Sequence, residues 1–307
     1  PSAVNNKKIY GDFKMKMALG IDIGGTKIYA ALINGSGEIC SEVEKYSTPK
    51  TAKEIVEKLK EIISKYEGEV EFSAISTAGG VNRENTKVIC STANLPEGYP
   101  NTDFSSLSNK PVFVENDANC AAWAEYKIGS AKGMENSITL TLGTGVGGGI
   151  IVDGRLLKGK SGTAGEMHFK MSLDKKRRCT CGAYDCFEIY ASGNGLRLSG
   201  IDVTGNKDIT TYDIIEGVDK GDEKMLRAYN IWQNHIIAGL CGLADIFDPD
   251  CIVLSGSMGK FCDIEYMEKL VNEEIVTMPT KILHASSGNY AGMIGAVLLG
   301  FDKLKLD

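Results

Sequence analysis

The sequence lacks any apolar run near the roughly 20 residues that a membrane-spanning helix requires, and its N-terminus lacks the apolar core of a secretory signal. An excess of positive charge is lacking too, since 34 basic residues stand against 40 acidic ones. The net charge of −6 argues against DNA or another polyanion as a partner, although a local cationic pocket for one nucleotide is compatible with it. We therefore expect a soluble, cytoplasmic protein that binds neither membrane nor nucleic acid.

Paired cysteines are also lacking. The nine cysteines are an odd number, and most stand singly in apolar segments, which fits reduced thiols better than a secreted disulfide framework. The exception is Cys179, Cys181 and Cys186, which place three soft donors in one glycine-containing loop. This spacing favours a tetrahedral Zn²⁺ site over three free thiols.

The chain of 307 residues is too long for one ordinary core and suits two domains, and its 43% hydrophobic content can fill both. Residues 1–16 are polar and aperiodic, so we expect a leader or a disordered segment there.

The most informative stretch runs from residue 138 to residue 152. A β-branched run from Ile138 to Leu142 meets five glycines between residues 143 and 149 and resumes as Ile150-Ile151-Val152, which predicts a β-hairpin. Its glycines would let backbone N–H groups approach an anion such as phosphate, with the Thr144 hydroxyl beside them. Taken alone, a glycine-rich turn without a ligand explains the pattern equally well.

A second hairpin is predicted upstream, between Met17 and Ile33. Its first strand carries Asp22 near its end, turns through Gly24-Gly25-Thr26 and returns through Lys27. The carboxylate could hold Mg²⁺ through water, and the lysine could offset phosphate charge. Two such hairpins suggest a duplicated nucleotide-binding architecture.

Polar residues follow two further predicted strands. The strand over 70–76 leads to Gly79-Gly80, which is either a simple turn or a ligand-facing loop. The strand over 111–114 leads to Asn116-Asp117 at the start of an alanine-rich helix, where Asp117 occupies a helix N-cap position. An aspartate there could instead accept a proton from a substrate hydroxyl that Asn116 orients. The two roles exclude one another unless Asn116 or Asn119 supplies the cap.

The remaining predicted elements follow from apolar periodicity and from breaker residues. Helices are predicted over 51–66, 118–127, 187–191, 211–218, 224–247, 267–276 and 288–304, and strands over 38–47, 251–254 and 282–285. In the last helix, Gly292 and Gly295 allow close packing.

Six motifs taken together, in chain order from about Met17 to the C-terminus, resemble the ROK family of sugar kinases and related repressors. They are Asp22-Ile-Gly-Gly-Thr-Lys27, Glu115-Asn-Asp-Ala-Asn119, Leu142-Gly-Thr-Gly-Val-Gly-Gly-Gly149, Ala164-Gly-Glu166, Cys179-x-Cys181-Gly-x-x-x-Cys186-x-Glu188 and Ile252-Val-Leu-Ser-Gly256. The resemblance implies an α/β protein with a two-domain ribonuclease H-like (actin/hexokinase-type) fold and an interdomain cleft. The implied domains are 17–115 plus 288–307, and 116–287 with the zinc-type loop.

The resemblance also implies an activity, the ATP-dependent phosphorylation of a hexose or hexose derivative, with a homodimer as the usual assembly. Asp117 would be the general base. Sugar hydroxyls would bind to Asn116, Glu166 and Glu188, with the Gly79-Gly80 loop facing the ligand. Nucleotide phosphates and Mg²⁺ would bind near Asp22, Gly24, Gly25, Thr26, Lys27, Gly143, Thr144 and Gly145, and the adenosine near Gly256.

The sequence departs from the family at one position. Family members usually read Gly-Glu-x-Gly-His, in which the histidine binds zinc and contacts the sugar, whereas this chain reads Gly165-Glu-Met-His168-Phe169. Either His168 still completes the zinc site of Cys179, Cys181 and Cys186, or the metal has another fourth ligand or is absent. If Phe169 fills the usual place, the sugar site near the anomeric end would be more apolar, and a sugar with a substituent there, such as a glycoside or an N-acyl hexosamine, becomes a candidate substrate.

Two other readings share these motifs. A sugar-responsive repressor would need a DNA-binding domain, and only sixteen residues precede the first predicted strand. A regulatory protein that binds sugar and nucleotide without kinase activity would leave Asp117 dispensable.

Overall fold

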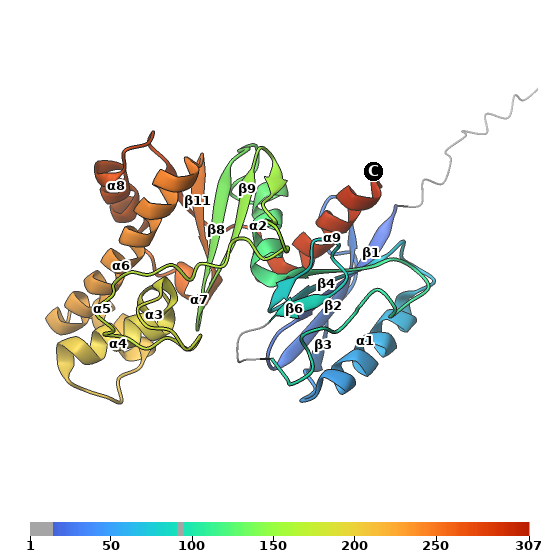
Figure 1. The fold of residues 1–307 in the computed structure, drawn as a ribbon, viewed down its shortest axis with the longest axis horizontal. Coiled ribbons are helices and arrows are strands. Elements are labelled where there is room, and N and C mark those ends of the chain that lie inside the picture. The colour runs from blue at the N-terminus through green and yellow to red at the C-terminus, as the bar shows by residue number, and fades with distance from the viewer. Residues whose placement is uncertain (1–14, 91–94, 307) are drawn as a thin grey trace, which may run out of the picture.

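The computed structural model describes residues 15–90 and 95–306, so most of the predicted leader lies outside the described residues. Two lobes, each built on a mixed sheet, lie side by side with helices α2 (Asp117–Lys127) and α9 (Ala291–Leu304) between them (Figure 1). Within the described residues, no helix is both long and apolar enough to span a membrane.

The N-terminal lobe contains a five-stranded sheet in the order β3-β2-β1-β4-β7. Strand β1 pairs antiparallel with β2 and parallel with β4, and β4 pairs parallel with β7. The bounds are β1 Met17–Ile23, β2 Lys27–Asn34, β3 Glu44–Ser47, β4 Ser73–Thr77 and β7 Val112–Asn116, with α1 over Ala52–Tyr66 and a small sheet of β5 (Gly80–Val81) and β6 (Val88–Cys90).

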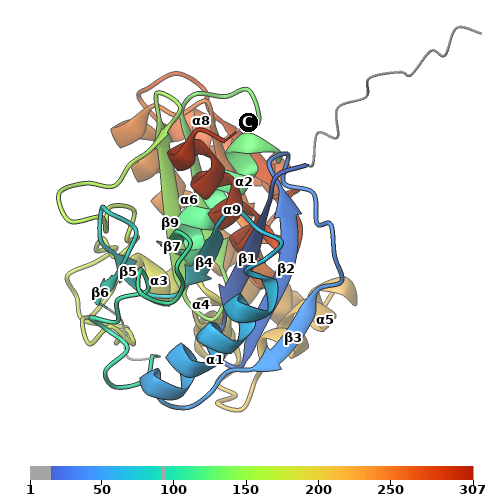
Figure 2. The ribbon, with the colours of Figure 1, turned by 90° about the vertical axis from the view of Figure 1, so that its right-hand side faces the viewer.

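Helices cover both faces of this sheet (Figure 2). Alternate residues of a strand point to opposite faces. Leu19 and Ile21 of β1 accordingly pack in one cluster with Leu59 of α1, whereas Ala18 packs in another with Val297 of α9. The sheet is therefore buried on both sides, which explains its continuous apolar strands.

The C-terminal lobe repeats this sheet plan in the order β10-β9-β8-β11-β12. Here β8 pairs antiparallel with β9 and parallel with β11. The bounds are β8 Ser137–Leu142, β9 Val146–Val152, β10 Arg155–Leu156, β11 Cys251–Ser255, β12 Lys281–His284, α3 Phe187–Ala191, α4 Gly193–Thr204, α5 Thr211–Asp219, α6 Glu223–Phe247, α7 Gly256–Gly259 and α8 Ile264–Glu274. The repeated order confirms the predicted duplication.

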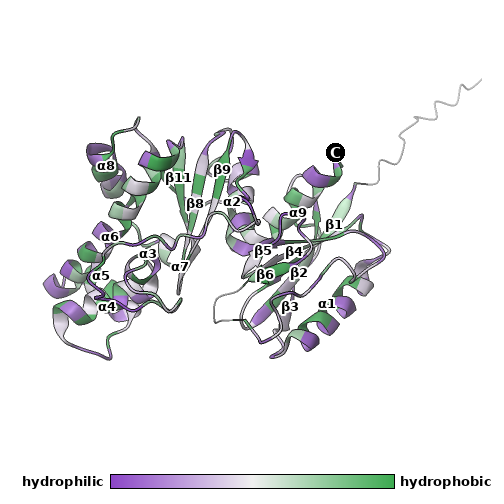
Figure 3. Cartoon of the chain, in the orientation of Figure 1, coloured by the Kyte–Doolittle hydropathy of each residue, from purple (hydrophilic) through white to green (hydrophobic). Residues whose placement is uncertain are grey.

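Hydrophobic residues concentrate in the central strands β8 and β11, while α1 and α8 alternate hydrophobic with hydrophilic positions (Figure 3). Helix α1 shows how the sequence sets such an element. It begins after Thr51, whose side chain and that of Glu54 form a capping box, and it buries Ile55, Leu59 and Ile62 along one face. The predicted helix over 51–66 is confirmed.

Helix α2 contacts both lobes. It packs against α9 and β7 on one side and against β8 and β9 on the other. Strands of the first sheet end at Asn116 and those of the second begin at Ser137. This arrangement is compatible with the predicted domains 17–115 plus 288–307 and 116–287, whose boundaries stay a prediction.

One predicted strand needs correction, and one helix was missed. The strand predicted over 38–47 forms only from Glu44, because the Ser41 hydroxyl accepts the N–H of Leu32 and takes the place of a backbone partner there. Helix α4 was not predicted. Glycine disfavours helix formation, so Gly195 and Gly200 argued against a helix here. Both are needed, because a side chain at either position would overlap Tyr190 or Ile214.

The glycines of the hairpin formed by β8 and β9 serve two purposes. Only Gly143-Thr144-Gly145 forms the tip, whereas Gly147, Gly148 and Gly149 lie within β9. A side chain at Gly147 or Gly149 would overlap helix α2, and one at Gly148 would overlap Met167. These three glycines therefore allow close packing rather than anion binding.

Candidate active site

Parallel strands bring the predicted polar residues of the N-terminal lobe to one sheet edge. Ile23 lies opposite Thr77, and Thr77 lies opposite Asn116. The residues that follow these three strands, including Gly79 and Asp117, therefore share the carboxyl edge of the sheet, where ligands of α/β proteins bind.

A cavity of about 490 Å³ lies at this edge, between the two lobes. The loop after β4 and the start of α2 line one side of it, and the hairpin tip, the loop before α3 and the first residues of α3 and α7 line the other. Its lining includes Gly79, Gly80, Asn116, Asp117, Gly143, Gly145, Thr163, Glu166, His168, Glu188 and Gly256. Ten of these eleven are predicted site residues, and Thr163 was not predicted.

Asn116, not Asp117, caps helix α2. Its side-chain oxygen accepts the N–H groups of Ala118 at 3.0 Å and Asn119 at 3.1 Å, while its amide nitrogen donates to the carbonyl of Gly79 at 3.1 Å. Among the residues that the structure describes, the carboxylate of Asp117, at the first helical position, accepts only the Ala118 N–H at 2.9 Å. Asp117 is therefore exposed to the cavity and keeps free acceptor positions for a ligand.

The surroundings of Asp117 raise its pKa to about 6. Desolvation by the protein around the cavity is the main cause, although the side chain itself faces the cavity. The negative charges of Asp22 and Glu166 add to it. A carboxyl group with this pKa is ionised at neutral pH and is a stronger base than an ordinary aspartate.

Glu188 joins the hairpin tip to the cysteine loop. Its carboxylate accepts the Val146 N–H at 3.2 Å, the Thr180 hydroxyl at 2.9 Å and the Cys179 thiol at 3.2 Å. Burial alone would raise its pKa, but the hydrogen bonds from Cys179 and Thr180 outweigh it and lower the pKa. The half-buried carboxylate of Glu188 therefore adds a negative charge to the lining of the cavity.

His168 faces the cavity, and Phe169 does not line it. The Nε2 atom of His168 lies 3.7 Å from Oε2 of Glu188, whereas the Phe169 ring stacks on Phe187 with ring centroids 4.8 Å apart. The expectation that Phe169 makes the sugar site more apolar is therefore wrong, because Phe169 packs away from the cavity and a polar imidazole faces it.

The cysteine loop gathers three sulfur atoms. The ligand atoms of Cys179, Cys181 and Cys186 all lie within 4.8 Å of one another, and the last two sulfurs are 3.5 Å apart. These soft donors fit Zn²⁺. His168 is not part of this cluster, because its imidazole is directed to Glu188, so the fourth ligand stays unassigned.

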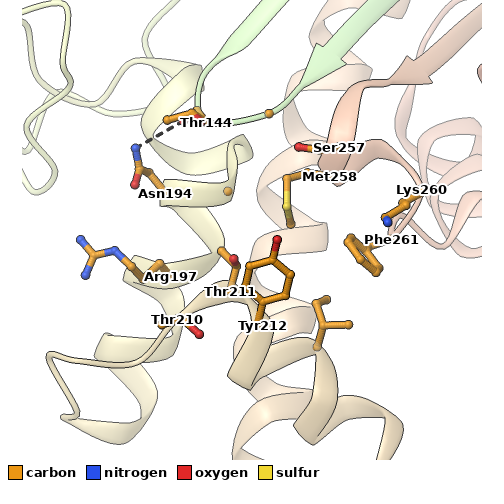
Figure 4. A pocket seen from close by; sticks show the side chains of 13 residues that line it. Thr144, Asn194, Arg197, Thr210, Thr211, Tyr212, Ser257, Met258, Lys260 and Phe261 are labelled. Carbon is orange, nitrogen blue, oxygen red and sulfur yellow. Dashed lines mark hydrogen bonds between the residues drawn. The ribbon is translucent and has the colours of Figure 1, made fainter. Parts of the chain in front are cut away.

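A second cavity, of about 440 Å³, lies beyond the hairpin tip between α4, α5 and α7 (Figure 4). Gly143 lines both cavities, so they meet at the tip. The amide of Asn194 donates to the Thr144 carbonyl at 3.3 Å and holds the tip against α4. Further lining residues are Arg197, Thr210, Thr211, Tyr212, Ser257, Met258, Lys260 and Phe261.

The N-terminal hairpin tip lies at the same sheet edge, but Gly24, Gly25, Thr26 and Lys27 are exposed and do not line these two cavities. Asp22 at its base is half-buried, and this burial raises its pKa. Its charge acts on Asp117, so the two carboxyl groups are close enough to interact.

Comparison with known proteins gives a consistent result. The ROK family matches residues 18–303. The chain is 35% identical to a glucokinase of Streptomyces coelicolor, covering 92% of this chain and 96% of that one, and 30% identical to an N-acetylmannosamine kinase of Yersinia pseudotuberculosis, covering 92% and 98%. This chain belongs to the ROK family.

A solved structure agrees. The ROK family glucokinase of Streptomyces griseus, determined in complex with glucose and AMPPNP, superposes with a TM-score of 0.77 at 31% identity over 92% of this chain and 98% of that one. The resemblance inferred from the six motifs and the actin/hexokinase-type fold are both confirmed.

Sequence reasoning missed most of the second cavity of this ROK protein. Ser257 and Lys260 follow the Gly256 turn, so they were within reach of that motif. Arg197 and Tyr212 carry no local pattern, because the cavity that they line forms only where α4 and α5 lie near α7 and the hairpin tip.

Proposed function

We propose that this protein transfers the γ-phosphoryl group of ATP to a hydroxyl group of a hexose or hexose derivative, with Asp117 as the general base. The observation that carries the proposal is the Asp117 carboxyl group, exposed in a cavity that it shares with the hairpin tip and with Glu166 and Glu188. ATP-dependent sugar kinase activity also follows from the relatives named above.

In the proposed reaction, Asp117 takes the proton of a sugar hydroxyl as that oxygen forms a bond to the γ-phosphorus. The bond between this phosphorus and the bridging oxygen breaks, and ADP leaves with the electron pair. Phosphoryl transfer requires mainly alignment and charge neutralisation. Mg²⁺, held near Asp22, would supply charge neutralisation.

The proposed ligand positions follow the two cavities. Adenosine would occupy the second cavity near Gly256, and the phosphates would pass Gly143-Thr144-Gly145 towards Asp117. The N-terminal tip residues Gly24, Gly25, Thr26 and Lys27 would approach the phosphates from the opposite lobe, which requires the lobes to close.

The sugar would bind in the first cavity beside Gly79 and Gly80, with hydroxyls held by Glu166 and Glu188. Asn116 can contribute less than expected, because its oxygen caps α2 and one amide hydrogen binds Gly79. Its second amide hydrogen stays free to donate to the sugar.

A sugar panel tests the function. ADP formation should depend on an added sugar, and we expect turnover with glucose or N-acetylmannosamine, the substrates named for the two relatives. Fructose and a β-glucoside extend the panel. ATP binding with no ADP formation for any sugar would favour the regulatory protein without kinase activity.

The pKa of Asp117 sets the expected pH profile. A general base must be ionised, so kcat/KM for the sugar should be constant well above pH 6 and fall as the pH drops through about 6, approaching about tenfold per pH unit. An aspartate with the ordinary value of 3.8 would keep full activity at pH 5. Steady-state rates in overlapping buffers measure the profile, and a profile flat down to pH 5 would contradict the assignment.

We further propose that Cys179, Cys181 and Cys186 hold Zn²⁺, and that the protein is a cytoplasmic homodimer. The three clustered sulfurs support the metal, and the assembly follows the family. Metal analysis of the purified protein tests the first proposal, since an equimolar zinc content is expected and a metal-free protein would refute it. Light scattering of the eluted protein tests the dimer.

A further inference from the structure

The loop after β10 joins the two lobes at the sugar side of the cleft. By sequence it follows a strand of the C-terminal lobe, and it carries Thr163 and Glu166 into the first cavity. Its contacts, however, reach the N-terminal lobe. Arg83 donates to the carbonyl of Gly159 at 2.7 Å, and Gly162 lies so close to the Val81 backbone that any side chain there would overlap it.

An ion pair anchors the start of this loop. The Lys158 ammonium group lies 2.5 Å from Oε2 of Glu115, and both side chains are largely withdrawn from solvent, with 14% and 2% exposed. The Glu115 carboxylate also accepts hydrogen bonds from the side chains of Asn85 at 2.7 Å and Asn119 at 3.1 Å. A buried carboxylate with this many donors is held in one position.

Glu115 directly precedes the residues that cap and begin α2. It accepts the N–H of Asn116 at 2.8 Å, so the same carboxylate holds the Lys158 loop and the backbone that leads to Asp117. Among the described residues, Lys158 is the only cation in an ion pair with Glu115.

We propose that Lys158 and Glu115 form a positioning pair that holds Glu166 in place relative to Asp117. The pair makes the Glu166 loop move with the N-terminal lobe, so that part of the sugar site stays assembled while the hairpin tip and Glu188 move with the C-terminal lobe. This inference rests on the proposed function for its kinetic consequence, but its structural consequence does not.

Lys158→Met tests the pair, and Lys160→Met is the matched control. Lys160 lies in the same loop but is exposed and makes no ion pair in the described chain. We expect Lys158→Met to raise the KM for the sugar by about tenfold or more, with a smaller change in kcat and an unchanged KM for ATP. Lys158→Arg, which keeps the cation, should restore most of the sugar affinity, and Lys160→Met should resemble the wild type.

Hydrogen exchange supplies a readout that is independent of catalysis. Lys158→Met should accelerate amide exchange in residues 157–166, and Glu115→Gln, which removes the charge and replaces one of the two accepting oxygens by an amide donor, should accelerate it too. Lys160→Met should leave the exchange unchanged. Equal exchange in wild type and Lys158→Met, or a KM for ATP that rises as much as that for the sugar, would overturn the inference. If the variants change amide exchange as expected but the wild type forms no ADP with any sugar, the proposed function alone would be refuted and the positioning pair would stand.

Discussion

Replacing Asp117 with asparagine is expected to lower kcat for sugar-dependent ADP formation by about 10²- to 10⁴-fold. Asparagine has nearly the same shape as aspartate but cannot accept the hydroxyl proton. Helix α2 should keep its start, because Asn116 supplies the cap. The loss should therefore come from chemistry and not from misfolding, and coupled-assay rates at saturating ATP and sugar measure it.

The control for this variant is Glu166→Gln, which changes another carboxyl group of the same cavity. It should raise the KM for the sugar and reduce kcat less than Asp117→Asn, since Glu166 is proposed to hold the sugar and not to move its proton. ATP affinity, measured by calorimetry, should stay within about twofold in both variants. Turnover of Asp117→Asn within tenfold of the wild type would show that another group is the base.

The hairpins of this protein could be predicted from the sequence because their signals are local. A β-branched run that meets glycine and resumes, as in Ile138 to Val152, determines a strand, a turn and a returning strand within a few residues. The start of α2 was predictable for the same reason. Which of Asn116 and Asp117 supplies the cap was not, because that choice depends on the Gly79 carbonyl, far away in sequence.

Long-range features of the site could not be predicted. The pairing of Lys158 with Glu115 and the cavity wall formed by Arg197 and Tyr212 join segments that carry no shared motif. His168 illustrates the same limit. Its one-residue displacement from the family pattern was visible, but the stacking of Phe169 on Phe187 decides which side chain faces the first cavity.

Replacing Gly295 with alanine is expected to destabilise the protein by about 1–3 kcal/mol or more. Helices α9 and α2 pack so closely at this glycine that an added methyl group would overlap the carbonyl oxygen of Cys120, and a backbone atom cannot move aside as a flexible side chain can. The free energy of unfolding from urea titration measures the effect.

Gly242→Ala is the matched control, because Gly242 also lies inside a helix, α6, but no atom of the described part of the chain lies within 4 Å of the added methyl group. It should stabilise the protein by about 0.5–1 kcal/mol, since alanine favours helix over glycine. A lower free energy of unfolding for Gly295→Ala and a higher one for Gly242→Ala would establish close helix contact at Gly295. Stabilisation by both substitutions would contradict it.

Gly295→Ala is also expected to lower the catalytic rate, because the contact between α9 and α2 positions the proposed base. Cys120 lies one helical turn beyond Asp117 on α2, so a methyl group that pushes this helix away from α9 also displaces the proposed base from the cavity. Because a shift of about 1 Å can cost about 10²-fold in rate, Gly295→Ala should lower kcat even at temperatures where it stays folded. Gly242→Ala should leave kcat unchanged, since α6 lines neither cavity.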